Sequence, residues 1–177
     1  TGMMQCLILT DADGVFLRDS IQYNDSRAKD EVAVLETLAG GAEKLSASLL
    51  NWKGSLSLPS KLLWLANNEP QMLGSARLAF LGAHDYVAHM LCGAHVTDAV
   101  TASTTGLLGH HGGYSFDLLR KLLPACPELK EIFPLIVSAS EAVGYVSSSA
   151  ASFFGLPTGV PVFHGCGDAG ATTCGIG

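Results

Sequence analysis

The most informative stretch for the fold reads Val160-Pro161-Val162-Phe163-His164-Gly165-Cys166-Gly167-Asp168-Ala169. Its apolar residues predict a strand over 160–165, and the small residues that follow predict a helix over 169–174. Glycines let a backbone and a ligand approach closely, and a helix N-terminus favours anions. A carboxylate such as Asp168 at this point can accept a proton from a hydroxyl nucleophile. Asp is also a common helix N-cap, however, so the pattern alone leaves its role open.

The rest of the chain mixes strands and helices. Apolar runs predict further strands at 4–10, 78–81 and 142–146. Residues at helical spacing or beside helix-stop signals predict helices at 32–38, 58–65, 83–91, 116–123 and 147–154. This alternation indicates an α/β or α+β fold with a mixed sheet, and no linker divides it.

Three local expectations accompany this pattern. The turn Asp11-Ala12-Asp13-Gly14 predicts an antiparallel hairpin that includes strands at 15–17 and 20–23. Asp25 or Ser26 is expected to cap the first helix. The Thr- and Ser-rich stretch 96–113 is expected to be a loop.

Composition narrows the class of protein. Of 177 residues, 48% are hydrophobic and 15% charged, with a mean hydropathy of +0.33, which excludes intrinsic disorder. The net charge is −6 and there is no run of Lys and Arg, so we expect no nucleic-acid partner. No apolar stretch approaches the roughly 18 residues that span a bilayer, so we expect no membrane partner.

The cysteines indicate the compartment. Five occur without a Cys-x-x-Cys pair, at Cys6, Cys92, Cys126, Cys166 and Cys174. An odd number of unpaired thiols favours the reducing cytoplasm over a disulfide framework. The nearest pattern to a metal site combines His164 with the last two cysteines, but zinc sites use closely paired ligands, so we expect no metal site in the protein itself. The histidines at 84, 89, 95, 110 and 111 show no catalytic spacing and are interpreted as core or surface residues.

Two polar segments have two interpretations each. The hydroxyl-rich stretch 97–105 lines a polar pocket or satisfies its own backbone. In the segment Tyr23 to Arg27, an aromatic beside polar groups suits stacking on a sugar, whereas Asp25 and Arg27 also suit capping and pairing.

Taken in order, several segments resemble the FGGY carbohydrate kinases, most closely the xylulokinase-like branch. The start, Thr1-Gly2-Met3-Met4-Gln5, is similar to the family's Ser-Gly-Gln-Met-His segment. The turn at 165–169 is similar to its Gly-Gly-Gly-Asp turn. The other matching segments are 21–27, 61–70, 84–87 (where relatives have Lys-Asp-Tyr-Leu) and 97–105.

The resemblance implies an α/β, actin-like (ribonuclease-H-like) domain with a mixed sheet flanked by helices. It implies transfer of a phosphoryl group from ATP with Mg²⁺ to a terminal hydroxyl of a ketose or polyol such as D-xylulose. Asp168 would be the catalytic base, held in the active-site turn by Gly165 and Gly167. The resemblance places the substrate-binding residues at Met4, Gln5, Tyr23, Asp168 and Ala169.

Departures from the family pattern concern the substrate. Gln5 stands where relatives have a sugar-contacting His, and Ala169 stands where an Asn or Gln follows the base. Met3 replaces a Gln, and Leu58 stands where small or hydroxyl residues are usual. Because a hydrogen-bonding site rejects analogues that lack the matching group, these exchanges change which polyol fits.

The resemblance also sets expectations for the whole protein. Residues 1–177 would be most of the first kinase domain, without the Asp-x-Gly-Thr phosphate loop upstream and the second domain downstream, so we expect the isolated chain to be inactive. Expected partners are a small sugar or polyol and the second domain, and relatives suggest a homodimer by analogy. Two alternatives stay open: a non-catalytic sugar-binding or regulatory module of actin-like fold, and another actin-like ATPase.

Overall fold

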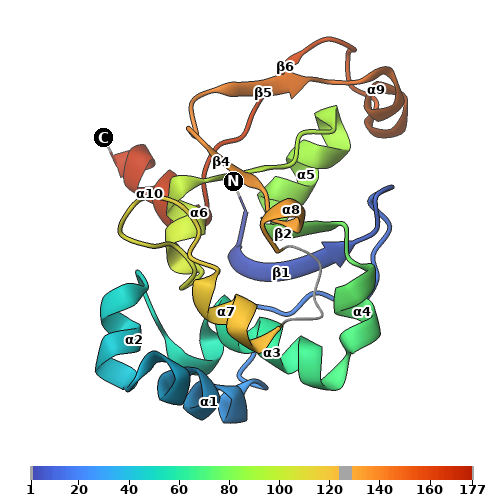
Figure 1. Cartoon of the computed structure of the whole chain (residues 1–177). Helices are drawn as coiled ribbons and strands as arrows, with labels where there is room; N and C mark the ends of the chain where they lie inside the picture. Colours follow the sequence, from blue (N-terminus) through green and yellow to red (C-terminus); the bar gives the residue numbers. More distant parts are fainter. Residues whose placement is uncertain (1, 124–128, 177) are drawn as a thin grey trace.

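The computed structural model describes residues 2–123 and 129–176 and shows an α/β fold (Figure 1). Its central ladder pairs β1 (Met4–Thr10) with β2 (Leu78–Gly82) in antiparallel register, Ile8 opposite Phe80. Both strands were predicted. The first hairpin is only partly confirmed, because 15–17 and 20–23 contribute single bridges, Thr10 to Phe16 and Leu7 to Ile21, and not strands.

The remaining described strands form two further ladders. β3 (Val96–Asp98) pairs in parallel with β4 (Leu135–Val137), and β5 (Ala142–Tyr145) pairs in antiparallel with β6 (Pro161–Phe163). Parallel and antiparallel pairing thus both occur, as a mixed sheet requires. Within residues 2–123 and 129–176 the strands nevertheless form three two-stranded ladders.

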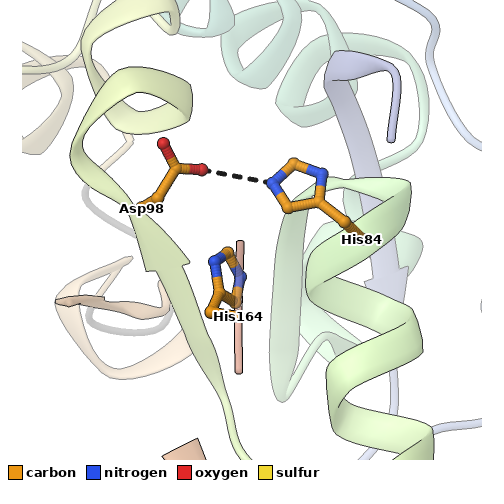
Figure 2. A group of neighbouring side chains, drawn as sticks. All are labelled: His84, Asp98 and His164. Atoms are coloured by element: carbon orange, nitrogen blue, oxygen red, sulfur yellow. Dashed lines mark hydrogen bonds and ion pairs between the residues drawn. The ribbon is translucent and has the colours of Figure 1, made fainter. Parts of the chain in front are cut away.

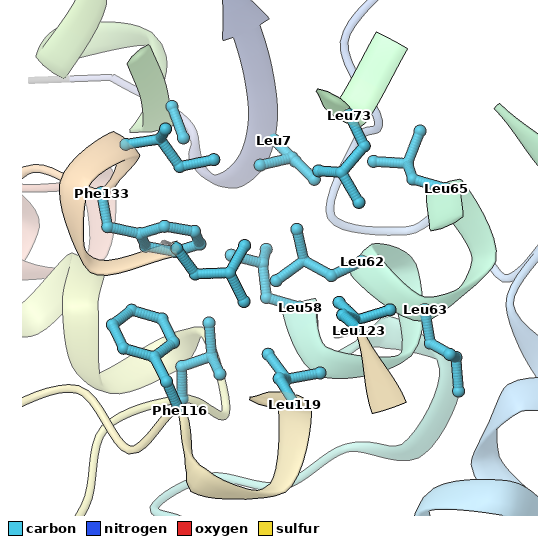
Figure 3. Packing of buried hydrophobic residues seen from close by; sticks show 14 of the residues in the cluster. Leu7, Leu58, Leu62, Leu63, Leu65, Leu73, Phe116, Leu119, Leu123 and Phe133 are labelled. Carbon is cyan, nitrogen blue, oxygen red and sulfur yellow. The ribbon is translucent and has the colours of Figure 1, made fainter. Parts of the chain in front are cut away.

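One layer of helices covers one side of β1, at the bottom of Figure 1. Its members are α1 (Lys29–Ala39), α2 (Ala42–Ser48), η1 (Gly54–Leu56), α3 (Leu58–Asn68), α4 (Pro70–Ser75) and α7 (Asp117–Leu122). α8 (Leu129–Ile132) lies beside β2 and contributes to the same core. Their buried leucines and phenylalanines form the main core with β1. Figure 3 shows Leu7 of β1 beside Leu58 and Leu62 of α3, with Phe116 and Phe133 across from them. This core packs the leucines of β1 against those of α3.

A second group of elements lies on the other side of β1. It contains α5 (Ala83–Cys92), α6 (Ala99–Thr104), α9 (Ser148–Phe154) and α10 (Asp168–Ile176). α5 contacts β5, β6 and α9 around a small cluster that includes Ala88, Val146 and Val162. The chain passes from this cluster through β6 into α10, so β6 and α5 together position the turn before Asp168.

Two predictions about the chain's local structure were wrong. The stretch 96–113 is not all loop, because β3 and α6 occupy 96–104. The N-cap of α1 is Ala28, and no side chain caps it. Asp25 instead pairs with Arg27 (2.6 Å), whose guanidinium lies over the Trp64 ring.

Cys6, Cys92, Cys166 and Cys174 are free thiols, and Cys126 lies outside the described residues. No described helix has the length and apolar character needed to cross a bilayer.

Candidate functional site

The glycine turn after β6 is packed against the start of β1. Gly165 has a φ of 74°, a left-handed conformation that glycine adopts without strain. A Cβ atom on Gly167 would lie 2.4 Å from the Met4 Sδ atom, so a larger residue would require the Met4 side chain or the turn to move. The Asp168 N–H donates to the Gly2 carbonyl (3.1 Å). These contacts hold the first residue of α10 beside the first residues of β1.

Asp168 is exposed at the N-terminus of α10. The helix begins at this residue, one position earlier than predicted. Its Oδ1 atom accepts a hydrogen bond from the Ala169 N–H (2.9 Å), and no cation of the described residues pairs with the carboxylate. A carboxylate that is exposed and not paired is available to accept a proton from a bound hydroxyl group.

A pocket of about 300 Å³ lies in front of this turn. Met4, Gln5, Tyr23 and Asp168 all line it, so the structure brings together four of the five residues expected to bind substrate. Ala169 does not line the pocket. Gly165 and Gly167 also stay outside its lining and shape the turn instead.

The sequence did not single out Lys53, which lines the pocket, whereas Thr104 lines it too and lies in the hydroxyl-rich stretch 97–105, for which a polar pocket was one of two interpretations. Met3, noted only as a departure from the family pattern, lines it too. Gln5 reaches Thr104 across 99 positions of sequence, and its side-chain amide donates to the Thr104 carbonyl. No local pattern marks such a long-range contact. Lys53 is a single cation in a polar segment, and nothing in its spacing distinguishes it from a surface lysine.

Tyr23 is positioned through a buried lysine of α3. Lys61 is fully buried, and its Nζ atom donates to the carbonyls of Gln22 (2.7 Å) and Tyr23 (3.5 Å). Burial lowers the pKa of Lys61 to about 8, although the charge of Asp25 opposes this shift. The ring of Tyr23 is 47% exposed, which leaves it accessible to a ligand in the pocket.

The helix that carries Thr104 is capped by a buried carboxylate. Asp98 Oδ1 accepts the N–H groups of Val100 (2.9 Å) and Thr101 (3.1 Å), and Oδ2 accepts the Thr101 hydroxyl (2.6 Å). Figure 2 shows the third partner of this carboxylate, the His84 ring, at 3.2 Å. Burial would raise the pKa of Asp98, but the hydrogen bonds from His84 and Thr101 lower it to about 2.

The hydroxyl-rich segment mainly satisfies its own backbone, as one of the two interpretations predicted. The hydroxyls of Ser103, Thr104 and Thr105 donate to carbonyls three residues earlier. Thr104 nevertheless lines the pocket, so the segment also contributes to the candidate site.

Side chains of the types that bind metal ions gather beside the start of α5. Across the described part of the chain, one group of His, Cys, Asp or Glu places its ligand atoms within 4.8 Å of one another, and it consists of His84, Asp98 and His164. Cys166 and Cys174 do not belong to it. The described hydrogen bonds already engage the three side chains, so the geometry is that of a hydrogen-bonded network.

Comparison with known proteins decides the family. The model of the FGGY family of carbohydrate kinases, N-terminal domain, matches residues 1–175. The chain belongs to this family. An L-fuculokinase of Salmonella typhi is 33% identical over 156 residues, which are 87% of this chain and 32% of that protein. A xylulose kinase of Escherichia coli K12 is 28% identical over 99% of this chain and 35% of its own length.

Solved structures of FGGY kinases show the same fold. The xylulose kinase of Rhodospirillum rubrum matches with a TM-score of 0.82 and 32% identity, covering 94% of this chain and 33% of that chain. A xylulose kinase of Brucella ovis matches with a TM-score of 0.80 and 29% identity, covering 99% of this chain and 36% of that one. The chain thus has the actin-like α/β fold of these kinases. It spans about a third of the length of the curated relatives it matches.

Proposed function

We propose that this chain forms the sugar site of an ATP-dependent carbohydrate kinase and supplies its general base. The observation that carries the proposal is the shared pocket of Gln5, Tyr23 and Asp168. It joins a carboxylate at a helix N-terminus to an amide and an aromatic ring. Polar groups beside an exposed ring suit a polyol, whose hydroxyls and carbon face need both kinds of contact.

In the proposed reaction, a terminal hydroxyl of a ketose or polyol loses its proton to the Asp168 carboxylate. The hydroxyl oxygen then forms a bond to the transferred phosphorus, and the bond from phosphorus to the leaving oxygen breaks. Gln5 and Tyr23 orient the substrate so that this hydroxyl faces Asp168. Positioning and charge stabilisation account for most of the catalysis of phosphoryl transfer.

The phosphoryl donor expected for this family is ATP with Mg²⁺. When bound, it supplies the γ-phosphoryl group and neutralises the charge that develops on it. Among the described residues that line the pocket, Asp168 carries the only carboxylate, and its proposed role as a base requires it to stay free of a cation, so this lining does not by itself hold Mg²⁺.

The test replaces Asp168 by Asn in the full-length kinase that contains this domain. We expect kcat to fall by about 100-fold or more, the usual contribution of a general base. Asp117→Asn is the matched control, since Asp117 is exposed on α7 and does not line the pocket. Equal turnover of the Asp168→Asn and Asp117→Asn enzymes in a coupled ADP-release assay would refute the assignment. Sugar binding without any phosphoryl transfer by the unmodified full-length protein would instead support the non-catalytic module.

The substrate is to be identified by assaying a panel of sugars and polyols and not from the name of a single relative. The relatives include an L-fuculokinase of Salmonella typhi, a xylulose kinase of Escherichia coli K12 and an autoinducer-2 kinase of Enterobacter, at 28–33% identity. We propose a D-xylulose-like ketose or polyol, and L-fuculose belongs in the same panel. The ratio of kcat/KM values between D-xylulose, L-fuculose and the polyols decides among them.

We further propose that residues 1–177 are most of the first domain of a longer kinase. The one-third coverage of its relatives supports this assignment. The partners would then be the sugar and a second kinase domain, with a homodimer as the assembly that relatives suggest. The free thiols support a cytoplasmic location, where disulfides are rare.

A further inference from the structure

A buried group of four side chains lies next to the turn and takes no part in the proposed reaction. We call His84, Asp85, Asp98 and His164 the buried cluster; their exposed fractions are 6%, 0%, 1% and 4%. They come from the start of α5, the end of β3 and the residue after β6. Figure 2 shows three of them converging from these separate elements. His164 directly precedes Gly165, so the cluster is joined to the turn that carries Asp168.

The Asp85 carboxylate is surrounded by donors. Its Oδ2 atom accepts the N–H groups of Leu81 (3.0 Å) and Gly82 (3.1 Å). Its Oδ1 atom accepts the Thr97 hydroxyl (3.3 Å) and lies 3.0 Å from His164 Nε2. The N–H groups of Leu81 and Gly82 and the Thr97 hydroxyl stabilise the ionised carboxylate, and a carboxylic acid is a stronger acid than an imidazolium, so the proton between Asp85 and His164 resides on the imidazole ring.

His164 is surrounded by acceptors. Its Nε2 atom faces the ionised Asp85 carboxylate, and its Nδ1 atom faces the Gly165 carbonyl at 3.1 Å. A neutral imidazole carries one N–H group and one lone pair, whereas the imidazolium carries two N–H groups. Only the imidazolium satisfies both contacts of His164, and the neutral ring leaves a lone pair facing an oxygen atom.

We propose that His164 is a positioning residue that acts as an imidazolium, joining Asp85 of α5 to the Gly165 carbonyl and thereby fixing the turn that presents Asp168. This role rests on the proposed function of Asp168. Loss of the His164 proton removes one of the two bonds and loosens the turn at its first residue. Alkaline pH then lowers turnover through the geometry of the base, while the lining of the sugar pocket by Gln5 and Tyr23 stays in place.

The charges around the cluster favour this protonated state. Burial would lower the pKa of His164, but the hydrogen bond and charge of Asp85, together with the Gly165 carbonyl and Asp98, raise it above its usual value. The other titratable group facing the ring is His84, with ring centroids 5.1 Å apart. Because the folded-state pKa exceeds the unfolded one, the stabilisation is complete below about pH 6.5 and is lost as pH rises through the folded-state pKa.

The first test is imidazole NMR of the chain labelled with ¹⁵N-histidine. We expect both ring nitrogens of His164 to carry protons at pH 7 and its titration midpoint to exceed that of His110, an exposed histidine with one bond to the Ala47 carbonyl. The His164→Gln spectrum assigns the signal. A neutral His164 at pH 7 overturns the proposal. Binding of one equivalent of Zn²⁺ by the native chain, lost in His164→Gln, also overturns the proposal, since a metal ion would then take the place of the proton.

The second test compares His164→Gln with His110→Gln in the full-length kinase. We expect His164→Gln to lower kcat about tenfold at pH 6.5 with KM changed less than threefold. This deficit should shrink above the folded-state pKa, where the native enzyme also lacks the proton, and His110→Gln should match the native profile. A deficit that is constant with pH indicates a merely structural role and overturns the proposal. Retained activity of Asp168→Asn would refute only the role of Asp168 as general base. The protonation of His164 is tested separately, because the NMR result does not depend on catalysis.

Discussion

At the scale of single residues, the turn before α10 depends on backbone contacts and on one very close approach. Gly167 lies against the Met4 side chain, and the Asp168 N–H bonds to the Gly2 carbonyl. The carboxylate itself is left exposed. This arrangement fixes the position of a reactive group without neutralising it with a cation, which a general base requires.

Gly167→Ala tests this close approach. The new Cβ atom would lie 2.4 Å from Met4 Sδ, so the Met4 side chain or the turn has to move. We expect a loss of about 1–3 kcal/mol in the free energy of unfolding, the usual cost of overpacking, and weaker sugar binding. The control is Gly175→Ala in α10, where no atom lies within 4 Å of the added Cβ. Urea denaturation of the two variants measures the difference, and equal stability would contradict the packing argument.

Asp98→Asn tests the charge of the buried cap. Asn keeps a side-chain oxygen for the N–H groups of Val100 and Thr101, but its amide nitrogen replaces the oxygen that faces the Thr101 hydroxyl and the His84 ring, so the exchange removes the charge together with these two contacts. Because the folded-state pKa of about 2 lies below the ordinary value of 3.8 for an aspartate, ionised Asp98 contributes about 2 kcal/mol of stability above pH 4. This contribution disappears as pH falls toward 2.

Urea denaturation at pH 7 and pH 3 checks this expectation for Asp98→Asn. The deficit of the variant should be larger at pH 7 than at pH 3. Asp19→Asn, at an exposed position, should show no such dependence. An equal deficit of Asp98→Asn at both pH values would show that its charge adds no stability.

The sequence predicts single residues well where a local motif carries them and poorly elsewhere. Asp168 is recognisable because glycines and a strand-to-helix change surround it. His84 carries no such signal, because its partner Asp98 lies 14 positions away and comes into contact only through folding. Lys53 and Thr104 reach the pocket in the same way.

At the scale of elements, α3 supports the segment that contains Tyr23. Lys61 extends from this helix to the Gln22 and Tyr23 carbonyls, and Arg27 lies over Trp64 of the same helix. The helix therefore serves two purposes: its leucines fill the core, and its polar side chains hold one wall of the pocket.

Lys61→Met tests this support. Methionine fills a similar volume but leaves the carbonyls of Gln22 and Tyr23 without this donor. We expect sugar binding to weaken by about 1 kcal/mol, roughly a fivefold rise in KM, because the Tyr23 segment loses its anchor. Lys44→Met, on the exposed surface of α2, is the control. An unchanged KM for Lys61→Met, measured on the full-length kinase, would show that the segment holds Tyr23 without this lysine.

The elements were predictable in proportion to their length and regularity. β1, β2, α3 and α5 were recognised because each has a continuous apolar or helical pattern. β3 was missed because three residues in a Thr-rich stretch give no period, and its strand character comes from pairing with β4. The prediction that Asp25 caps α1 was wrong because its side chain is paired with Arg27.

At the scale of the whole molecule, apolar side chains remain exposed on one face. They belong to β5, β6, α9 and the segments beside them, and include Tyr145, Phe153, Phe154, Leu156 and Phe163. Figure 1 shows these elements together at the top of the fold, across β1 from the helix layer that contains α1, α2 and α3. Such a surface suits further protein of a longer kinase, whose relatives are about three times the length of this chain.

The chain by itself should therefore separate sugar recognition from catalysis. The pocket that contains Gln5, Tyr23 and Asp168 lies within the described residues, so we expect the isolated chain to bind a substrate sugar. A sugar at 100 times its Kd should raise the free energy of unfolding by about 2.7 kcal/mol, which a thermal-shift titration with D-xylulose, L-fuculose and polyols detects. Asp168→Asn should keep this shift, whereas Tyr23→Ala should reduce it.

Phosphoryl transfer needs a nucleotide beside the sugar, and this chain corresponds to about one third of its relatives. We expect no sugar-dependent ADP release from residues 1–177, even at sugar concentrations that produce the full thermal shift. ADP release from the isolated chain would show that these residues hold both substrates. If the isolated chain shows no sugar binding and no turnover, the pocket takes its final form only when the rest of the kinase is present. Preorganised polar and aromatic groups are what distinguish a sugar site from an open surface.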